Sequence, residues 1–300
     1  MKIKPLFVAT AISVSILNTS CSGDKEEEIN LSNDSTAVEI KESVPENYET
    51  FFQVPSPGEM LSFIKSVGKR DKSKLDILNP TQNLNKYTDN KSKALNFGVY
   101  STDLSYCSIF NHGAESIKYF KVVKQLGDQL GLSSTIQPDM LARIEKNIDN
   151  TDSLSAITDD LYFMSFETLD QSKQGSTLAL VVAGGWIESI YIAVNMVNKF
   201  DPSNPVIQRI KDQKYTLENL IEFLKKHESD NEDVKQVKAD LEDLMKTFAL
   251  LKEEKIAADT KNENGKKLIG GGVNLIIDEK SYNEIKNKVV TIRNNYTQNQ

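Results

Sequence analysis

The most apolar stretch beyond the N-terminal region is residues 177–200, TLALVVAGGWIESIYIAVNMVNKF. Its length of about 20 apolar residues would suffice to cross a membrane. Glu188 lies at its middle, however, and a central carboxylate costs about 2.5 to 3.5 kcal/mol even on lenient insertion scales. The stretch is also too long for a strand. The pattern therefore predicts a helix buried on most sides, at the centre of a helical domain.

The polar positions of this helix recur at spacings of three and four residues, which places them in one stripe. They are Gly184, Glu188, Tyr191, Asn195 and Asn198. One interpretation is that the stripe is the part of the helix that reaches water. The other is that Gly184 and Gly185 let a second helix or a ligand approach, while Glu188 faces a polar cavity. A glycine inside a helix costs about 1 kcal/mol against alanine, so a pair suggests a packing or functional reason.

Apolar periodicity and end signals predict helices along most of the remaining chain. Ser56, Pro57 and Glu59 are typical of a helix start. Further helices are expected at residues 91–110, 114–130, 138–150, from an Asp152 cap to about 170, from Pro205, from a Thr216 cap, at 233–258 and from an Asp278 cap. The predicted fold class is all-α: a multi-helix bundle or an irregular array of antiparallel helix hairpins.

Residues 266–277, KKLIGGGVNLII, interrupt the helical pattern. Two short apolar runs around Gly270, Gly271 and Gly272 predict a small β-hairpin or extended flap, with a surface loop of some strand character as the alternative. The segment lacks both the G-x-G-x-x-G pattern and the Walker lysine, so it is not a phosphate loop.

Two carboxylates stand out because each lies in an apolar helix beside a glycine and a tyrosine. They are Asp103, near Tyr100, and Glu188, near Tyr191. Brought together, the two acids can hold a cation, bind a polar ligand or perform acid–base work. Alternatively they cap neighbouring backbone, meet Arg143 in a structural ion pair, or, for Asp103, point to water at the edge of an apolar face. The structural role is favoured, and an acid that is buried there needs a partner.

Other chemistry is not indicated. Cys107 lies at helical spacing from apolar neighbours, which is typical of a small hydrophobic residue that is buried. His112 fits the end of a helix. The chain has only two cysteines and two histidines, and they offer no zinc-type cluster. The segment NIDNTDSLSAI lacks the glycine and glutamate of a calcium loop. No serine elbow, metalloprotease motif or kinase set is present. We therefore predict no catalytic residue, metal or cofactor.

Composition limits the class of protein and of partner. With 300 residues, 39% hydrophobic and 26% charged, the chain suits one soluble globular domain with some polar excess. Its net charge is −7, and it becomes −9 without residues 1–20, which carry two lysines and no acid. Such a balance argues against nucleic acid as a partner.

The first twenty residues have the pattern of an export signal, a positive start followed by an apolar run at residues 6–17. The run ends at LNTSC, and the small residues before Cys21 resemble the lipobox of bacterial lipoproteins, although Asn18 stands where an aliphatic residue is typical. The resemblance implies that Cys21 is diacylated and becomes the mature N-terminus. The alternative is an ordinary secretory signal next to an incidental cysteine.

Residues 22–28, SGDKEEE, resemble the surface-export signal of lipoproteins from Bacteroidota-type bacteria. The alternative is a solvated linker. Residues 21–48 are predicted to be a lipidated cysteine with a disordered acidic tether, and residues 49–300 a single helical domain. The predicted location is the outer membrane, lipid-anchored and exposed at the cell surface, with a periplasmic orientation as the alternative.

The segments GVYSTDLSY, IEKNIDNTDSL and GGWIESIY together resemble an uncharacterised group of helical lipoproteins of the same bacterial type. The resemblance covers most of residues 90–200 and implies an all-helical fold and a lipid anchor, without an activity. The predicted function is a non-enzymatic binding or scaffold module whose partners are the membrane, through its anchor, and an envelope protein or small polar ligand. The alternative is an envelope hydrolase or a polar-ligand or cation-binding protein that uses Asp103 and Glu188.

Overall fold

The computed structural model describes residues 54–67, 74–229, 231–256, 260–263, 266–269 and 272–298. All of these residues belong to one unit that spans Ser43–Gln300. The predicted signal peptide, Cys21, the tether, Gly270 and Gly271 lie outside the described residues, so the expectations for them stay predictions.

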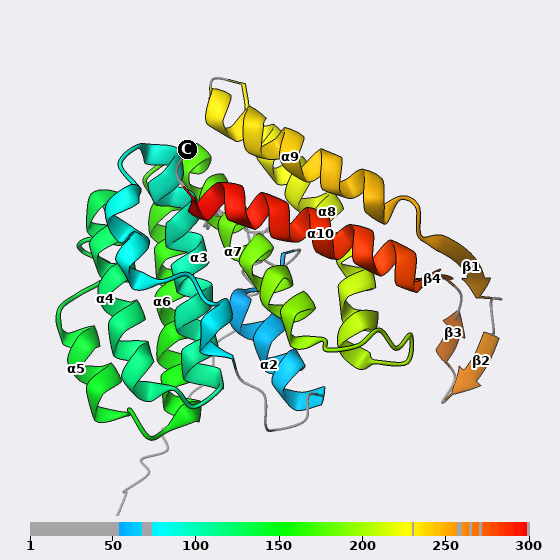
Figure 1. Cartoon of the computed structure of the whole chain (residues 1–300), viewed down its shortest axis with the longest axis horizontal. Coiled ribbons are helices and arrows are strands. Elements are labelled where there is room, and N and C mark those ends of the chain that lie inside the picture. Colours follow the sequence, from blue (N-terminus) through cyan, green and yellow to red (C-terminus); the bar gives the residue numbers. More distant parts are fainter. Residues whose placement is uncertain are drawn as a thin grey trace, which may run out of the picture. The chain divides into compact units, whose positions relative to one another are not determined.

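The all-α fold class with a small β element is confirmed (Figure 1). The helices are α2 (Pro57–Val67), α3 (Asn90–Ile109), α4 (Gly113–Gln129), α5 (Asp139–Lys146), α6 (Thr151–Gln171), α7 (Gly175–Met196), α8 (Pro205–Lys226), α9 (Glu232–Phe248) and α10 (Glu279–Thr297), with 3-10 turns η1 (Leu75–Ile77) and η2 (Thr81–Lys86). The strands are β1 (Lys252–Ile256), β2 (Thr260–Glu263), β3 (Lys266–Ile269) and β4 (Gly272–Ile276).

Several helix ends form where the sequence signals lie. At the start of α2, the Ser56 hydroxyl accepts the Glu59 N–H while the Glu59 carboxylate accepts the Ser56 N–H, which is the reciprocal capping box. Asp278 accepts the Ser281 N–H at the start of α10, as predicted. Asn150, rather than Asp152, caps α6 by accepting the Ser153 N–H. Two helix starts are therefore confirmed and one is displaced by two residues.

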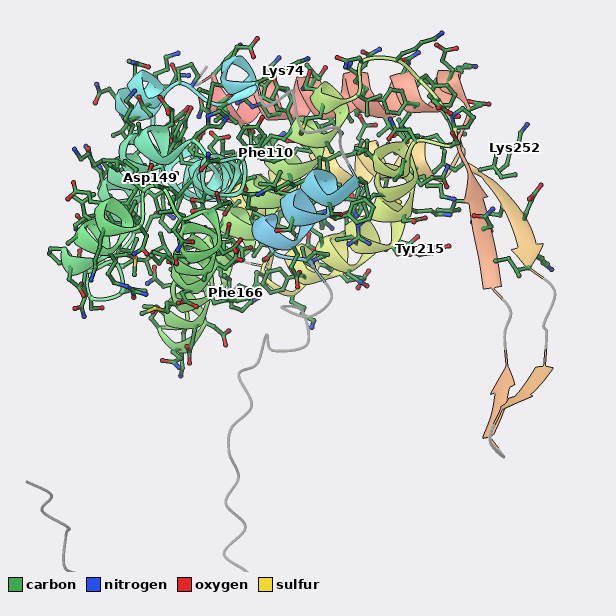
Figure 2. The ribbon with its side chains drawn as sticks, turned by 90° about the horizontal axis from the view of Figure 1, so that it is seen from below. Lys74, Phe110, Asp149, Phe166, Tyr215 and Lys252 are labelled. Carbon is green, nitrogen blue, oxygen red and sulfur yellow. The ribbon has the colours of Figure 1, made fainter. Side chains whose placement is uncertain are left out.

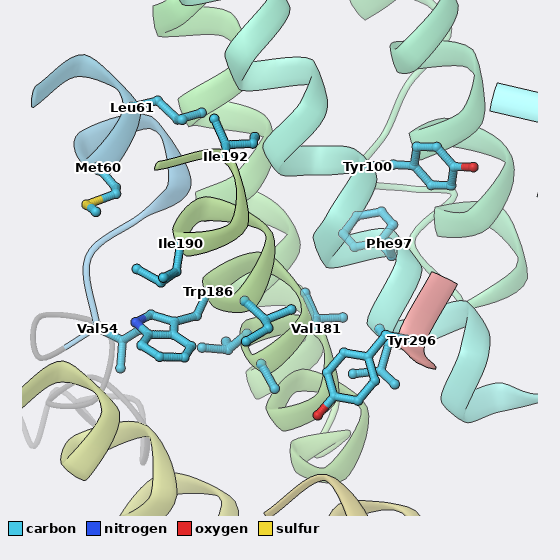
Figure 3. Close-up of a cluster of buried hydrophobic side chains, with 14 of the residues drawn as sticks. Val54, Met60, Leu61, Phe97, Tyr100, Val181, Trp186, Ile190, Ile192 and Tyr296 are labelled. Carbon is cyan, nitrogen blue, oxygen red and sulfur yellow. The ribbon is translucent and has the colours of Figure 1, made fainter. Parts of the chain in front are cut away.

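Helix α7 is the central helix of the bundle. It contacts α2, α3, α6, α8, α9 and α10, and its most extensive contact is with α3. Figure 3 shows Trp186 and Ile190 of α7 within the apolar core, near Val54. By length and composition α7 is apolar enough to cross a membrane, but 94% of its most apolar stretch is buried inside the protein. The interpretation of α7 as a core helix therefore agrees with the structure.

Helices α3 and α7 approach so closely that their backbones touch where each carries a glycine. A Cβ atom on Gly184 would lie 2.0 Å from the carbonyl oxygen of Leu95, and one on Gly98 would lie 2.1 Å from that of Val181. Between them, the Thr102 hydroxyl lies 3.0 Å from the Gly98 carbonyl oxygen and 3.2 Å from that of Gly185. We call this contact the α3–α7 seam; it permits the approach of a helix rather than of a ligand.

Two helical predictions were wrong in extent. Residues 205–226 form one continuous helix, because apolar side chains from Ile207 to Leu224 keep facing the core, and Thr216 lies inside it. The helix predicted to reach residue 258 ends at Phe248, because residues 252–256 pair with a distant strand instead. Pairing between distant segments overrides a local helical pattern.

The four strands form two antiparallel pairs, which we call the β-ribbon. Strand β1 pairs with β4, with Lys252 opposite Ile276 and Ile256 opposite Gly272, and β2 pairs with β3. The hairpin expected at 266–277 is thus built from strands β3 and β4 that pair with earlier strands, not with each other. Figure 2 shows β1 and β4 leading away from the helices near Lys252. Buried Leu251, Leu275 and Ile277 anchor the base.

Candidate functional site

The α3–α7 seam leads to a buried ion pair between Glu188 and Arg293. The guanidinium Nε donates to Glu188 Oε2 at 2.9 Å and Nη2 donates to Oε1 at 3.1 Å. Glu188 is 0% exposed and Arg293 7% exposed. The two residues are 105 positions apart, on α7 and α10. The paired geometry and additional hydrogen bonds compensate the cost of removing both charges from water.

The guanidinium has three further partners. Its carbon lies 4.4 Å from the centre of the Tyr191 ring, within the range of a cation–π contact. Nη2 also reaches the Ile77 carbonyl oxygen at 3.5 Å, and Nη1 the Thr297 hydroxyl at 3.5 Å. Arg293 therefore connects α10 to α7 and to η1. Burial opposes its charged form, but the Glu188 carboxylate outweighs burial and raises the pKa of Arg293 above its ordinary value.

Asp103 lies beside this pair on α3 and is 0% exposed. Its Oδ2 accepts the Asn79 N–H at 3.1 Å, while its Oδ1 is buried without a standard partner. Burial, followed by the nearby charge of Glu188, raises the pKa of Asp103 well above its ordinary value, and Arg293 opposes this shift. Two adjoining carboxyl groups in a dry site disfavour a second negative charge, which is the physical reason for this shift.

Amide and phenol groups surround these three ionisable residues. The Asn79 side-chain amide donates to the Tyr87 hydroxyl at 3.0 Å and to Asn96 Oδ1 at 3.3 Å. Asn96 in turn donates to the Tyr296 carbonyl oxygen, and the Tyr87 hydroxyl donates to that of Thr297. The last turn of α10 is thus held by side chains from residues 79–96. We call Asp103, Glu188, Arg293 and these partners the polar cluster.

The other predicted site residues have structural partners. The Tyr100 hydroxyl donates to the Pro80 carbonyl oxygen at 2.8 Å, and Gly184 and Gly185 line the seam. Gly184 and Glu188 are fully enclosed, Tyr191 and Asn195 are half-buried, and Asn198 is exposed. Water therefore reaches the stripe from Tyr191 onward but not Gly184 or Glu188. Cys107 is buried, as expected of a small hydrophobe, and burial raises the pKa of its thiol well above the ordinary value.

The sequence predicted the two acids but not their partner. Arg143 is exposed on α5, and Arg293 takes the role that had been considered for Arg143. The sequence did carry a signal for Arg293. Arg293 follows Val289 by four residues, and the same face of the helix holds Tyr282 and Ile285. An arginine therefore lies on an otherwise apolar helix face. Asn79, which precedes Pro80, carried no comparable signal.

The polar cluster is closed to solvent. A cavity of about 740 Å³ beside the α7–α8 connection is lined by other residues, and one of about 350 Å³ near the end of α10 shares only Tyr296 with the cluster. Among the described residues, no group of three or more histidine, cysteine, aspartate or glutamate side chains is placed to hold a metal ion. The arrangement is chemically suited to fixing α3, α7 and α10 to one another.

Comparison of the chain with protein-family models, with curated proteins and with solved structures finds no match.

Proposed function

We propose that this protein is a non-enzymatic binding or scaffold module of the bacterial cell envelope, anchored in the outer membrane through acyl chains on Cys21. The observation that carries the non-enzymatic part is the polar cluster. Both Glu188 oxygens accept from Arg293, Asp103 accepts from Asn79, and both acids are fully buried. A substrate would have to displace α10 to reach these carboxyl groups, so a structural clamp explains them better than acid–base catalysis.

The anchor part of the proposal rests on the sequence of residues 1–28. The positive start, the apolar run, the lipobox-like LNTSC and the following acidic cluster resemble bacterial lipoproteins. More than one acyl chain makes such an anchor stable, since each buried methylene contributes about 0.8 kcal/mol. The resemblance of residues 90–200 to helical lipoproteins points to the same class.

The lipid anchor is tested by metabolic labelling with an alkyne analogue of palmitate in a bacterium of this type. We expect the wild-type chain to be labelled and to fractionate with membranes, and Cys21→Ala to lose the label. Cys107→Ala is the matched control and should keep it. An unlabelled wild-type chain would remove the anchor from the proposal. Protease treatment of whole cells should digest a surface-displayed chain and spare a periplasmic one.

The binding role is tested by photo-crosslinking in intact envelopes. Ile256 in the β-ribbon and Tyr215 in α8 have exposed side chains in the wild-type structure, so each is replaced in turn by a photoreactive residue. A scaffold should yield discrete adducts from at least one of these positions. A chain that stays monomeric, with no adduct and no bound ligand, would count against the binding role.

A further inference from the structure

A cleft of about 350 Å³ lies where the start of α3 meets α9 and the end of α10. Its inner wall is formed by Ser92, Leu95 and Tyr296, which are buried, and its rim includes Gln236 and Asn295, which are exposed. Three helices distant in sequence therefore contribute to one concave surface. The volume corresponds to roughly a dozen water molecules, which is the size of a small metabolite rather than of a peptide.

Tyr296 brings a polar group to this cleft. Its side chain is 5% exposed, and its buried hydroxyl has no well-aligned hydrogen-bond partner; the Asp240 carboxylate is the group that interacts with it. Figure 3 shows the hydroxyl directed away from Phe97 and Tyr100 of the core. On that side it faces Asp240, whose charge adds to burial in raising the pKa of Tyr296. A buried hydroxyl without a well-aligned partner is uncommon, because its desolvation is then poorly compensated.

The charged groups of the cleft are Asp89 and Lys91 from the start of α3 and Asp240 from α9, so its formal net charge is −1. Asp89 is already engaged, since it accepts the Ser92 N–H and the Ser92 hydroxyl, both at 2.8 Å. Lys91 lies near enough to lower the pKa of both acids. Asp240 is half-buried, and burial raises its pKa, whereas hydrogen bonds from Gln236 and Tyr296 and the charge of Lys91 oppose that shift.

We propose that this cleft binds a small organic cation, whose ammonium or guanidinium N–H groups pair with the Asp240 carboxylate and reach the Tyr296 hydroxyl. The amide oxygens of Gln236 and Asn295 at the rim supply further acceptors. An anion is disfavoured by the charge of the cleft. A metal ion is disfavoured because only two carboxylates line it and one of them serves as a helix cap.

This inference goes beyond the proposed function, because it assigns a ligand class to a second site and does not depend on lipid attachment. The polar cluster and the cleft are separate: Tyr296 meets the cluster through its backbone carbonyl, which accepts from Asn96, and the cleft through its side chain. A ligand in the cleft would therefore contact the same turn of α10 that the cluster fixes.

The test is a calorimetric and NMR titration of the full chain with agmatine and with ethanolamine, and with 1,4-butanediol as the uncharged control. We expect saturable binding of at least one amine with a Kd of about 1 mM or tighter, and none of the diol. Asp240→Asn should weaken binding at least about tenfold and Tyr296→Phe about threefold, since each removes one partner. Circular dichroism melting confirms that the variants are folded.

Two matched controls define specificity. Asp243→Asn removes a carboxylate from the same helix outside the cleft, and Tyr215→Phe removes an exposed hydroxyl elsewhere; both should bind like wild type. No saturable binding of either amine, or equal loss in Asp243→Asn and Asp240→Asn, would overturn the inference and leave a hydrated cleft only. If the chain is labelled by palmitate but binds neither amine, the cleft proposal fails and the anchor proposal stands. If the chain is unlabelled but binds an amine, the anchor proposal fails and the cleft proposal stands.

Discussion

The α3–α7 seam and the β-ribbon both contain glycine and charge, yet their surroundings differ completely. In the seam, a Cβ on Gly184 would meet the Leu95 carbonyl oxygen at 2.0 Å, whereas a Cβ on Gly272 of the ribbon would meet nothing within 4 Å. The Glu188–Arg293 pair is buried, whereas the Lys214–Glu253 pair at the ribbon base leaves half of the glutamate side chain exposed. The same residue types are therefore constrained in one region and nearly free in the other.

This difference indicates which contacts specify the arrangement of the helices. A buried charge without its partner is costly, so the polar cluster penalises any arrangement in which α10 does not meet α7. Strands β1 and β4 have no such requirement: all of β1 is exposed, and of β4 only Leu275 is buried. Lys211, which donates to Asn274 Oδ1 and the Leu275 carbonyl oxygen, fixes the ribbon at its base. Four sets of substitutions test this difference between the buried helices and the ribbon.

The largest effect is expected from Arg293→Met, which leaves Glu188 buried without a counter-charge. The free energy of unfolding should fall by about 3 to 5 kcal/mol, measured by urea denaturation. Lys288→Met is the matched control on the same helix, because Lys288 pairs with Asp243 at the surface and should cost about 1 kcal/mol or less. Equal losses in the two variants would mean that Arg293 is not a structural clamp.

Gly184→Ala should cost about 3 kcal/mol, because the new methyl group collides with backbone atoms of Leu95 that cannot rotate away. Gly185→Ala is the informative neighbour: its Cβ would lie 3.5 Å from the Gly98 carbonyl oxygen, an ordinary contact, and alanine favours the helix by about 1 kcal/mol. Gly185→Ala should therefore be neutral or slightly stabilising in thermal melts. Similar losses at the two positions would contradict the geometry of the seam.

The pH dependence of stability should differ between the two kinds of carboxylate. The pKa of Asp103 is raised in the folded state above its ordinary value of 3.8, so the folded protein binds the extra proton. The stability that Asp103 contributes is complete below pH 3.8 and is lost as the pH rises through its folded pKa. Asp103→Asn keeps an acceptor for the Asn79 N–H but does not titrate. The free energy of unfolding of wild type should therefore fall relative to that of Asp103→Asn as the pH rises.

The contribution of Asp243 to stability should change with pH in the opposite direction. Its pKa is lowered, chiefly by a hydrogen bond from Lys288, so its contribution exists above pH 3.8 and is lost only as the pH falls. Urea denaturation of wild type, Asp103→Asn and Asp243→Asn across acidic and neutral pH measures both. A wild-type advantage over Asp103→Asn that grows with pH would contradict a raised pKa of Asp103 in the folded state.

The smallest effect is expected in the ribbon. Ile256 is 57% exposed and Val273 42% exposed, so Ile256→Ser and Val273→Ser should each change the free energy of unfolding by about 0.5 kcal/mol or less. Hydrogen exchange should show β1 amides exchanging far faster than those of α7, which is buried along most of its length. Strong protection of β1 would instead indicate that a partner covers the ribbon.

The fold was predictable where signals are local. The apolar run of α7, the capping box at Ser56 and the Asp278 cap depend on neighbours within one helical turn, and each led to the observed helix. The helix prediction failed at residues 249–256, because β1 is defined by its pairing with β4 rather than by its own pattern. Likewise Thr216 resembles a cap but lies inside α8, where continued core packing overrides the local preference.

From the sequence alone it followed that α7 is a buried helix and that Asp103 and Glu188 are unusual, whereas a close approach at Gly184 and Gly185 was one of two interpretations. Only the tertiary structure decided that Gly184 meets Leu95, that the two acids adjoin and that Arg293, rather than Arg143, supplies the counter-charge. The physical reason is range. Helix formation follows from residues three or four positions apart, whereas the partner of a buried charge is fixed by how distant helices cross.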